Sequence, residues 1–276
     1  FSYGPMYGVQ IAFKDFKVRQ GIWGSKWVGM KHFQNFWGTY SFNRLITNTL
    51  TLSIYSLVAG FPIPILLALM LNECGNVKFK KTVQMITYAP HFISTVVMCS
   101  IVLLFITSGK NGMLNNFRQA LGATDRIDFI AKPNYFANIY VWSGIWQSMG
   151  YSSIIYIAAL SGIDPSLHEA AVVDGASKLR RVWHIDLPGI IPTITILLIL
   201  NVGSLMNIGY EKVLLLQNDL NMSASDIIAT YVYRQGLENA QYSFSAAVGL
   251  FNSVVNTILL VTVNFITKKL GETSLF

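Results

Sequence analysis

Five long apolar stretches constrain the fold of this chain more than any other feature. They cover residues 45–71, 83–107, 136–160, 189–210 and 244–267. A helix needs about 20 apolar residues to cross a bilayer, where it satisfies its own backbone amides. Soluble helices of this length normally carry a polar stripe, and these stretches show almost none. We therefore expect an all-α transmembrane protein in which residues 45–267 form five complete transmembrane helices.

The first eight residues, FSYGPMYG, are typical of the outer end of a further membrane helix. The chain starts in a hydrophobic context and without Met, so we expect six helices in the intact protein, with the first largely missing here. A cleaved signal peptide is the competing explanation. We expect residues 1–276 to form a single transmembrane domain, in which residues 1–44 hold the end of the first helix and an extracytoplasmic segment.

Three short segments that should share one side of the membrane, if the five stretches alternate, are rich in lysine and arginine. These residues are Lys78, Lys80 and Lys81, then Lys178, Arg180 and Arg181, and finally Lys268 and Lys269. The segments expected on the opposite side hold more of these residues in total, but they are long, and the charge rule weakens for long loops. Cytoplasmic loops carry an excess of basic residues, so we expect the loop at 164–188 to be cytoplasmic. The net charge of +7 is then explained by loop topology, with no nucleic acid as partner.

The loop at 164–188 is the most charged part of the chain and has clear helix signals. Asp164 and Pro165 are typical of a helix start, Gly175 of a helix end, and Ser177 of the start of a second short helix that precedes the next span. The second helix carries basic residues on one face and apolar residues on the other. Such a helix lies on a membrane surface or inserts into a groove of a partner, and the pattern leaves both open.

A motif in this loop resembles the EAA loop of membrane subunits of ATP-binding-cassette (ABC) importers. The spacing EAA-x3-G-x9-I-x-LP is complete, from Glu169 to Pro188. FSYGPMYG, AFKDF, WVGMKHF and the NTL at Asn48 resemble the carbohydrate-importer branch, in particular permeases for oligosaccharides and polysaccharides such as alginate. The resemblance implies a MetI-like permease fold, a bacterial cytoplasmic (inner) membrane location with several passes, and import of a carbohydrate.

The resemblance also implies roles for residues of the loop, which in the family forms coupling helices seated in a cleft of the ATPase subunit. Glu169 would make a charged contact, Ala170 and Ala171 would allow close packing, and Gly175 would form the turn. The pattern adds Trp183 and Leu187 as apolar anchors. The complete set of expected coupling residues is Glu169, Ala170, Ala171, Asp174, Gly175, Trp183, Ile185, Leu187 and Pro188.

The chain has no motif for ATP hydrolysis. A phosphate-binding loop reads G-x-x-x-x-G-K-[ST], and the nearest fragment, SGKNG at 108–112, lacks the first Gly and the Ser or Thr. The chain is therefore not expected to be an enzyme or to hold a cofactor. The resemblance implies that two partner ATPase subunits bind ATP and Mg. It also implies a second permease subunit, expected to be a different chain, and an extracytoplasmic solute-binding protein.

A path for a sugar should present hydrogen-bonding groups and aromatic faces. The candidates inside the spans are Trp142, Trp146, Gln147, Tyr151 and Tyr156 on the third stretch, Asn201, Asn207 and Tyr210 on the fourth, and Glu211 at its outer end. Glu211 and Lys212 are conspicuous because charges at membrane depth are rare. The alternative for these side chains is aromatic packing, hydrogen bonding between helices, or contact with the headgroup region.

Other classes of function compete with the importer. An importer for a non-sugar solute would share the loop motif. A secondary transporter should show repeated discontinuous helices with buried ionisable groups, and only Glu211 and Lys212 come close. A membrane enzyme would need a cluster of His, Asp, Glu or Cys, and the four His are scattered. Cys74 and Cys99 suggest neither a disulfide nor a metal site.

Overall fold

The computed structural model describes residues 6–269, and residues 1–5 and 270–276 lie outside the description. Most of the expected end of a first membrane helix, FSYGPMYG, falls on those outer residues. The described chain begins with a 3-10 helix, η1 (Tyr7–Phe13), and a short antiparallel strand pair, β1 (Lys14–Asp15) and β2 (Lys26–Trp27). Everything that follows is helix and connecting loop.

The helices fall into long spans and short connecting pieces. Between and after the strands come α2 (Gly21–Gly24), α3 (Lys31–Trp37), α4 (Phe42–Gly60), α5 (Pro62–Asn72), α6 (Val77–Tyr88), η2 (Ala89–Phe92), α7 (Thr95–Ile106), α8 (Met113–Ala120) and α9 (Pro133–Ser161). The second half contains α10 (Pro165–Val173), α11 (Lys178–Arg181), η3 (Val182–Asp186), α12 (Leu187–Gly203), α13 (Tyr210–Leu216), α14 (Met222–Ser225), α15 (Ile228–Tyr233), η4 (Arg234–Glu238) and α16 (Tyr242–Lys269).

Three helical stretches in the described chain are long and apolar enough to cross a membrane. They are Phe42–Asn72, Lys178–Gly203 and Tyr242–Lys269, and the pair α6–η2 and α7 makes a fourth if it counts as one span. The 29-residue helix α9 is long enough, but its Asn, Gln, Ser and aromatic side chains make it less apolar than these. All five apolar stretches are thus largely helical, while five complete spans remain a prediction.

Two of the stretches are not the single helices that the sequence predicted. The stretch 83–107 bends by 105° between η2 and α7, where Pro90 has no amide hydrogen and Ser94 caps the next helix. The stretch 189–210 leaves its helix at Gly203. The backbone beyond it is held by side chains of other helices, since Met206 N donates to Asn256 Oδ1 at 2.9 Å and Ser53 Oγ donates to Leu205 O. Non-helical backbone at membrane depth needs such partners.

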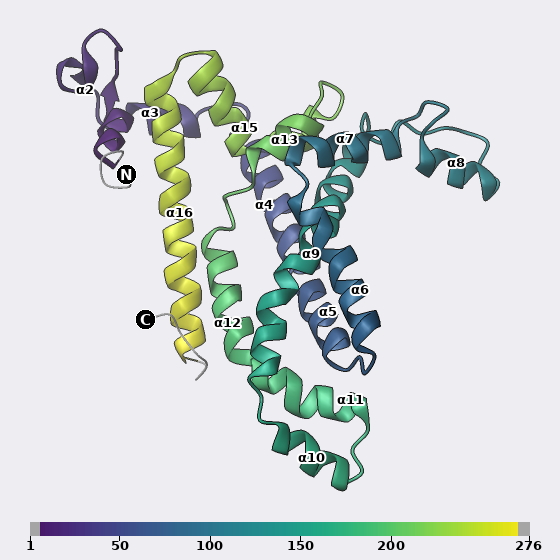
Figure 1. Ribbon diagram of the computed structural model, residues 1–276. Helices are drawn as coiled ribbons and strands as arrows, with labels where there is room; N and C mark the ends of the chain where they lie inside the picture. Colours follow the sequence, from purple (N-terminus) through teal and green to yellow (C-terminus); the bar gives the residue numbers. More distant parts are fainter. Residues whose placement is uncertain (1–5, 270–276) are drawn as a thin grey trace.

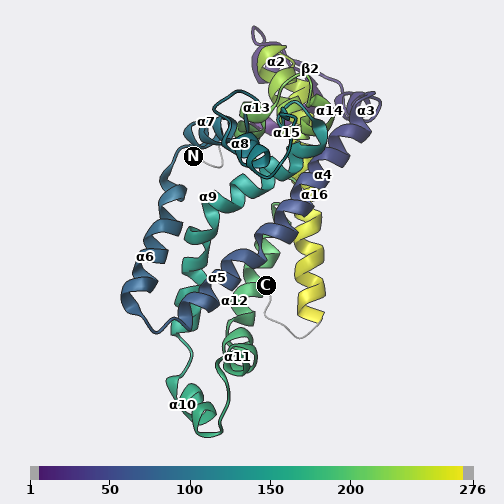
Figure 2. The same ribbon diagram turned by 90° about the vertical axis from the view of Figure 1, so that its right-hand side faces the viewer.

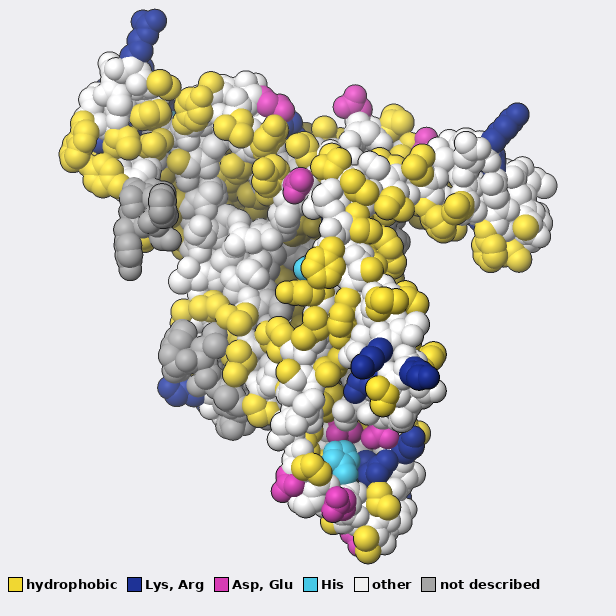
Figure 3. Space-filling model, in the orientation of Figure 1, with side chains coloured by type: hydrophobic (Ala, Val, Ile, Leu, Met, Phe, Trp, Pro, Cys, Tyr) yellow, Lys and Arg dark blue, Asp and Glu magenta, His cyan; other side chains and the backbone are white. Residues whose placement is uncertain are grey.

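The two ends of the molecule are clearly different. Helices α10 and α11 project from one end, and α2, α3, α7, α8, α13 and α15 form the other (Figures 1 and 2). The last turn of α16 and the turn between α5 and α6 point toward the α10–α11 end. The three basic segments therefore lie toward the same end, as the sequence predicted. Figure 3 shows charged side chains gathered over α10 and α11, with apolar side chains covering much of the middle.

Helix α9 is the central element and packs against α4, α5, α6 and α12. A buried cluster that includes Ile65, Tyr156 and Ile190 joins α5, α9 and α12. Helices α6 and α9 approach each other closely at Gly150, where an added Cβ would lie 2.2 Å from the Thr87 carbonyl oxygen. Only glycine fits this contact without movement of the backbone. The packing of α9 therefore fixes the spacing of the helices around it.

A buried carboxylate links helices at the end of the molecule that lies opposite α10 and α11. Asp226 is 2% exposed and lies before α15. Its Oδ2 accepts from Arg44 Nη2 of α4 at 3.2 Å, and its Oδ1 accepts from Arg234 Nη2 of η4. Asn48 Nδ2 also donates to the Asp226 carbonyl oxygen at 2.9 Å. One residue thereby ties α4 to the α14–α15 segment, which is distant in sequence.

Candidate functional site

The loop that the sequence singled out begins with helix α10. The helix starts at Pro165, as predicted, and Asp164 caps it by accepting a hydrogen bond from Ser166 N at 2.9 Å. The backbone and hydroxyl donors of Ser166 hold the pKa of the Asp164 carboxyl below its ordinary value. A charged cap also suits the positive end of the helix dipole. The start of α10 is therefore well defined although the helix projects from the body.

Helix α10 ends in a glycine-dependent turn. Asp174 caps its end, and Gly175 takes a φ of +75°, which L side chains rarely adopt. Ala176 N donates to Ala171 O at 2.8 Å and Gly175 N donates to Val172 O at 3.0 Å. This pattern satisfies the last carbonyl groups of a helix while the chain reverses. Gly175 thus forms the turn between the two helices of the loop.

The second helix of the loop continues directly into the next membrane span. Ser177 starts it, and α11, η3 and α12 form one helix from Lys178 to Gly203. The sequence predicted a short separate helix instead. Pro188 lies inside this long helix, where its ring would clash with the preceding turn of a regular α-helix. The π-helical turn η3 immediately precedes it and changes the local hydrogen bonding, so the helix continues past the proline.

The expected coupling residues differ in exposure. Glu169, Ala170, Asp174, Gly175, Trp183 and Pro188 are exposed, whereas Ala171, Ile185 and Leu187 are half-buried. Leu187 packs against the chain's own α5–α9–α12 cluster. Four apolar side chains that sequence reasoning did not select are also exposed on the loop, namely Leu167, Val172, Val173 and Leu179. Trp183, which is 68% exposed, adds a fifth exposed apolar side chain to this projecting part of the molecule.

Two polar contacts hold the helices of the loop, one to each other and one to the end of α5, and sequence reasoning missed both. His168 Nε2 of α10 lies 3.2 Å from Oδ1 of the fully buried Asp186, at the end of η3. Arg181 Nη2 of α11 lies 3.5 Å from Glu73 Oε2, just after α5. The one signal in the sequence was an acidic residue, Asp186, beside a long apolar run. Helix α10 is thus in contact with the end of η3, which continues into α12, and α11 is in contact with the end of α5.

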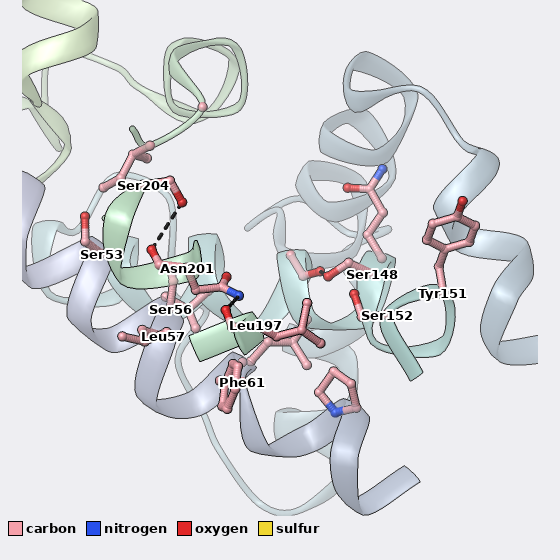
Figure 4. Close-up of a pocket in the computed structure, with 18 of the residues that line it drawn as sticks. Ser53, Ser56, Leu57, Phe61, Ser148, Tyr151, Ser152, Leu197, Asn201 and Ser204 are labelled. Atoms are coloured by element: carbon pink, nitrogen blue, oxygen red, sulfur yellow. Dashed lines mark hydrogen bonds between the residues drawn. The ribbon is translucent and has the colours of Figure 1, made fainter. Parts of the chain in front are cut away.

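A cavity of about 750 Å³ lies between α4–α5, α9, α12 and the segment that leads to α13. Figure 4 shows Ser53, Ser56, Leu57 and Phe61 on one wall, Ser148, Tyr151 and Ser152 on another, Leu197 and Asn201 on α12, and Ser204 directly after α12. Hydroxyl, amide and aromatic groups thus alternate with aliphatic ones. The volume is in the range of pockets that hold small organic ligands.

Five of the expected path residues are in the cavity wall, namely Gln147, Tyr151, Tyr156, Asn201 and Asn207. Gln147 Nε2 donates to Ile93 O at 2.9 Å, and the Tyr151 ring stacks on the His91 ring with a centroid distance of 3.9 Å. Both contacts reach the bend between η2 and α7. The wall of the cavity is thereby joined to the bent segment.

The other expected path residues lie outside the cavity lining. Trp142 Nε1 donates to Tyr55 Oη at 2.9 Å, and Trp146 is 40% exposed. Tyr210 stacks on Tyr233, and Glu211 is exposed. The neighbour of Glu211, Lys212, is the charged residue that lines the cavity instead. A one-residue step along α13 turns the side chain by about 100°, which sequence inspection did not resolve.

Metal chemistry has no support in the part of the chain that the structure describes. Residues 6–269 hold no group of three or more His, Cys, Asp or Glu that is placed to bind a metal ion. Cys74 and Cys99 are both free thiols. The candidate functional features in the described chain are the projecting helical loop at one end and the polar cavity between the helices.

The sequence matches known proteins over nearly its whole length. The family model described as "Binding-protein-dependent transport system inner membrane component" matches residues 36–272. Protein LplB of Bacillus subtilis is 43% identical over 276 residues, which are all of this chain and 86% of LplB. The polygalacturonan/rhamnogalacturonan transport system permease protein YteP of Bacillus subtilis is also 43% identical, over all of this chain and 85% of YteP.

Solved structures show the same fold. A chain from the crystal structure of a bacterial ABC transporter involved in import of the acidic polysaccharide alginate matches with a TM-score of 0.89 and 41% identity, over 98% of this chain and 90% of that chain. A chain from the alginate transporter in complex with alginate pentasaccharide-bound periplasmic protein matches with a TM-score of 0.91 and 40% identity, over all of this chain and 91% of that chain. The chain belongs to the family of binding-protein-dependent transport system inner membrane components, the multi-pass, non-catalytic permease subunits of ABC importers.

Proposed function

We propose that this permease imports an oligosaccharide or polysaccharide that an extracytoplasmic solute-binding protein delivers, and that the cavity between α4–α5, α9 and α12 is part of its path. The observation that carries the proposal is the composition of the cavity wall, where Ser, Asn, Gln and Tyr side chains adjoin aliphatic ones. Sugars present hydroxyl groups and apolar C–H faces, and such a wall complements both. The carbohydrate relatives, YteP and the alginate transporter, support the same substrate class.

We also propose that the helical loop binds the ATPase subunits and moves with them when they bind and hydrolyse ATP. The chain has no phosphate-binding loop motif, and membership of the ABC importer family implies that two partner ATPase subunits bind ATP and Mg. Glu169, Ala170, Ala171, Asp174 and Gly175 form the contact region on and after α10, and Trp183, Ile185, Leu187 and Pro188 continue it toward α12. Movement of a rigid helix pair against a packed core is a common means of switching a transporter.

The assembly has further proposed components. A second permease subunit, expected to be a different chain, is proposed to complete the path, as the resemblance to ABC importers implies. Six membrane helices are proposed for the intact subunit. Trp142, Trp146, Tyr210 and Glu211 stay candidates for contact with substrate in another conformation, since they border the lining residues in sequence. An importer for a non-sugar solute is less consistent with the carbohydrate relatives.

The proposal predicts a transport defect for Asn201→Leu. This substitution removes an amide from the cavity wall and keeps a similar volume, so sugar hydroxyls lose a partner. One hydrogen bond contributes roughly 0.5–1.5 kcal/mol, which corresponds to about a threefold to tenfold higher KM for uptake of labelled trigalacturonate by the reconstituted transporter. The probe is chosen because YteP belongs to a polygalacturonan transport system.

The matched control is Asn239→Leu, an exposed asparagine beyond η4. It should leave the KM for uptake unchanged. An unchanged KM in both variants would remove Asn201 from the path. Wild-type transporter that hydrolyses ATP but accumulates no sugar would contradict the proposed function itself.

A further inference from the structure

We propose that Lys212 makes the cavity selective for an anionic carbohydrate by binding a sugar carboxylate through its ammonium group. The inference rests on the proposed function of the cavity as a sugar path and names the substrate class more narrowly. The observation that supports the inference is the position of one cation, Lys212, in a cavity wall that is otherwise uncharged.

The geometry places the ammonium group of Lys212 at the cavity. Its Nζ donates a hydrogen bond to Tyr140 O of α9 at 2.6 Å and lies 4.5 Å from the centre of the Tyr140 ring. An ammonium group has three N–H donors, so two others remain for a ligand. Gly144 leaves space for the ammonium group, because a Cβ at position 144 would lie 2.9 Å from Lys212 Nζ. Lys212 is therefore held in a defined place by α9.

The charge of Lys212 is not neutralised by a neighbouring carboxylate. Among the residues that line the cavity, it alone carries a formal charge, and no Asp or Glu is among them. The ion pairs found within residues 6–269 do not include Lys212. An anion that enters a partly enclosed site with an unpaired cation gains more from the attraction than it would in water. The adjacent Glu211 is exposed and lies outside the lining.

The chemistry favours a carboxylate over the other anionic groups of sugars. The hydroxyl and amide groups of the wall already match a neutral sugar, and a cation adds more affinity for a charged sugar than for a neutral one. Sulfate and phosphate esters carry three outer oxygens and are typically held by several donors or by the fork of an arginine. A single ammonium group is a point charge that suits one carboxylate. A uronic-acid oligosaccharide fits this description.

The test compares a charged sugar with its neutral ester. The transporter, assembled with its second permease and its ATPase subunits in nanodiscs, is titrated with labelled trigalacturonate and with the trimethyl ester of that trimer, in the absence of binding protein. In wild type we expect trigalacturonate to bind more tightly than the ester, and high salt to weaken only the charged probe. Lys212→Gln should raise the Kd for trigalacturonate about tenfold. The Kd for the ester should change less than about threefold, and Lys212→Arg should retain most of the affinity for the charged probe.

Control variants distinguish the effect of losing the Lys212 charge from the effect of disturbing the structure. Lys110→Gln removes an exposed lysine before α8 and should change neither Kd. Gly144→Ala displaces the Lys212 ammonium without removing its charge and should weaken trigalacturonate more than the ester, which keeps the test decisive if Lys212→Gln does not assemble. Equal losses for both probes, or no loss for either, would overturn the inference and leave the sugar path in place. Binding of neither probe by wild type, together with absent uptake, would overturn the proposed function and the inference with it.

Discussion

Asp226→Ala is expected to lower the stability of the folded permease more than the substitutions in the cavity wall. The change leaves Arg44 and Arg234 without their shared carboxylate at a site where Asp226 is 2% exposed. Removal of one partner of a buried ion pair costs about 3–5 kcal/mol, and the partly exposed arginines place this case near the lower end. We expect strongly reduced yield of folded subunit and a lower Tm in detergent.

Two variants define the cause of that loss. Asp219→Ala, at an exposed position in the same segment, should leave the yield and the Tm unchanged. Asp226→Asn keeps the size and some hydrogen bonding but removes the charge, so it should lie between wild type and Asp226→Ala. A Tm for Asp226→Ala within experimental error of wild type would show that the Asp226 contacts do not hold α4 to the α14–α15 segment.

Gly175→Val is expected to uncouple import from ATP hydrolysis while the subunit still inserts and assembles. The residue has a φ of +75°, and a non-glycine residue in this region costs about 1–2 kcal/mol, with more for a β-branched one. The turn would open to relieve this strain and shift α10 relative to α11. We expect import of trigalacturonate to fall at least about tenfold while the rate of ATP hydrolysis is retained. The displaced coupling helices would no longer convert the movement of the ATPase subunits into movement of the membrane helices.

Gly122→Val is the matched control for this experiment. Gly122 also has a positive φ, of +98°, and a Cβ added there would meet no atom within 4 Å, but the residue follows α8 at the opposite end of the molecule (Figure 1). It should reduce import far less than Gly175→Val. Gly175→Asn should retain part of the coupling, because asparagine tolerates the left-handed region better than valine. Equal import by Gly175→Val and wild type would remove the turn from the coupling mechanism.

The loop was the most predictable part of this molecule. Its start at Pro165 and its turn at Gly175 follow from local rules, since a capping Asp, a following Pro and a glycine act within a few residues. The long helices were predictable for a similar reason, because apolar length needs no knowledge of the partners. The likeness of the loop to a known family then supplied an expectation of function that the family match confirms.

The remainder depended on contacts distant in sequence. The early end of α12 at Gly203 requires Asn256 and Ser53 to satisfy the backbone beyond it, and no local pattern shows these partners. The same holds for Asp226, whose two arginines come from α4 and η4. Selection of Lys212 over Glu211 as a cavity residue depends on how α13 is rotated against α9. Side-chain direction on a short helix is set by tertiary packing, which the sequence alone does not display.

The coupling role of the loop is tested most directly by the ATPase activity of the assembled transporter in lipid with sugar-loaded binding protein, for wild type and for Glu169→Lys. Glu169 is exposed on α10, so its reversal should not disturb the fold. We predict that loaded binding protein stimulates the wild type and that Glu169→Lys loses both the stimulation and copurification of the ATPase subunit. Full stimulation of Glu169→Lys, or a wild-type permease that copurifies with no ATPase subunit, would contradict this role.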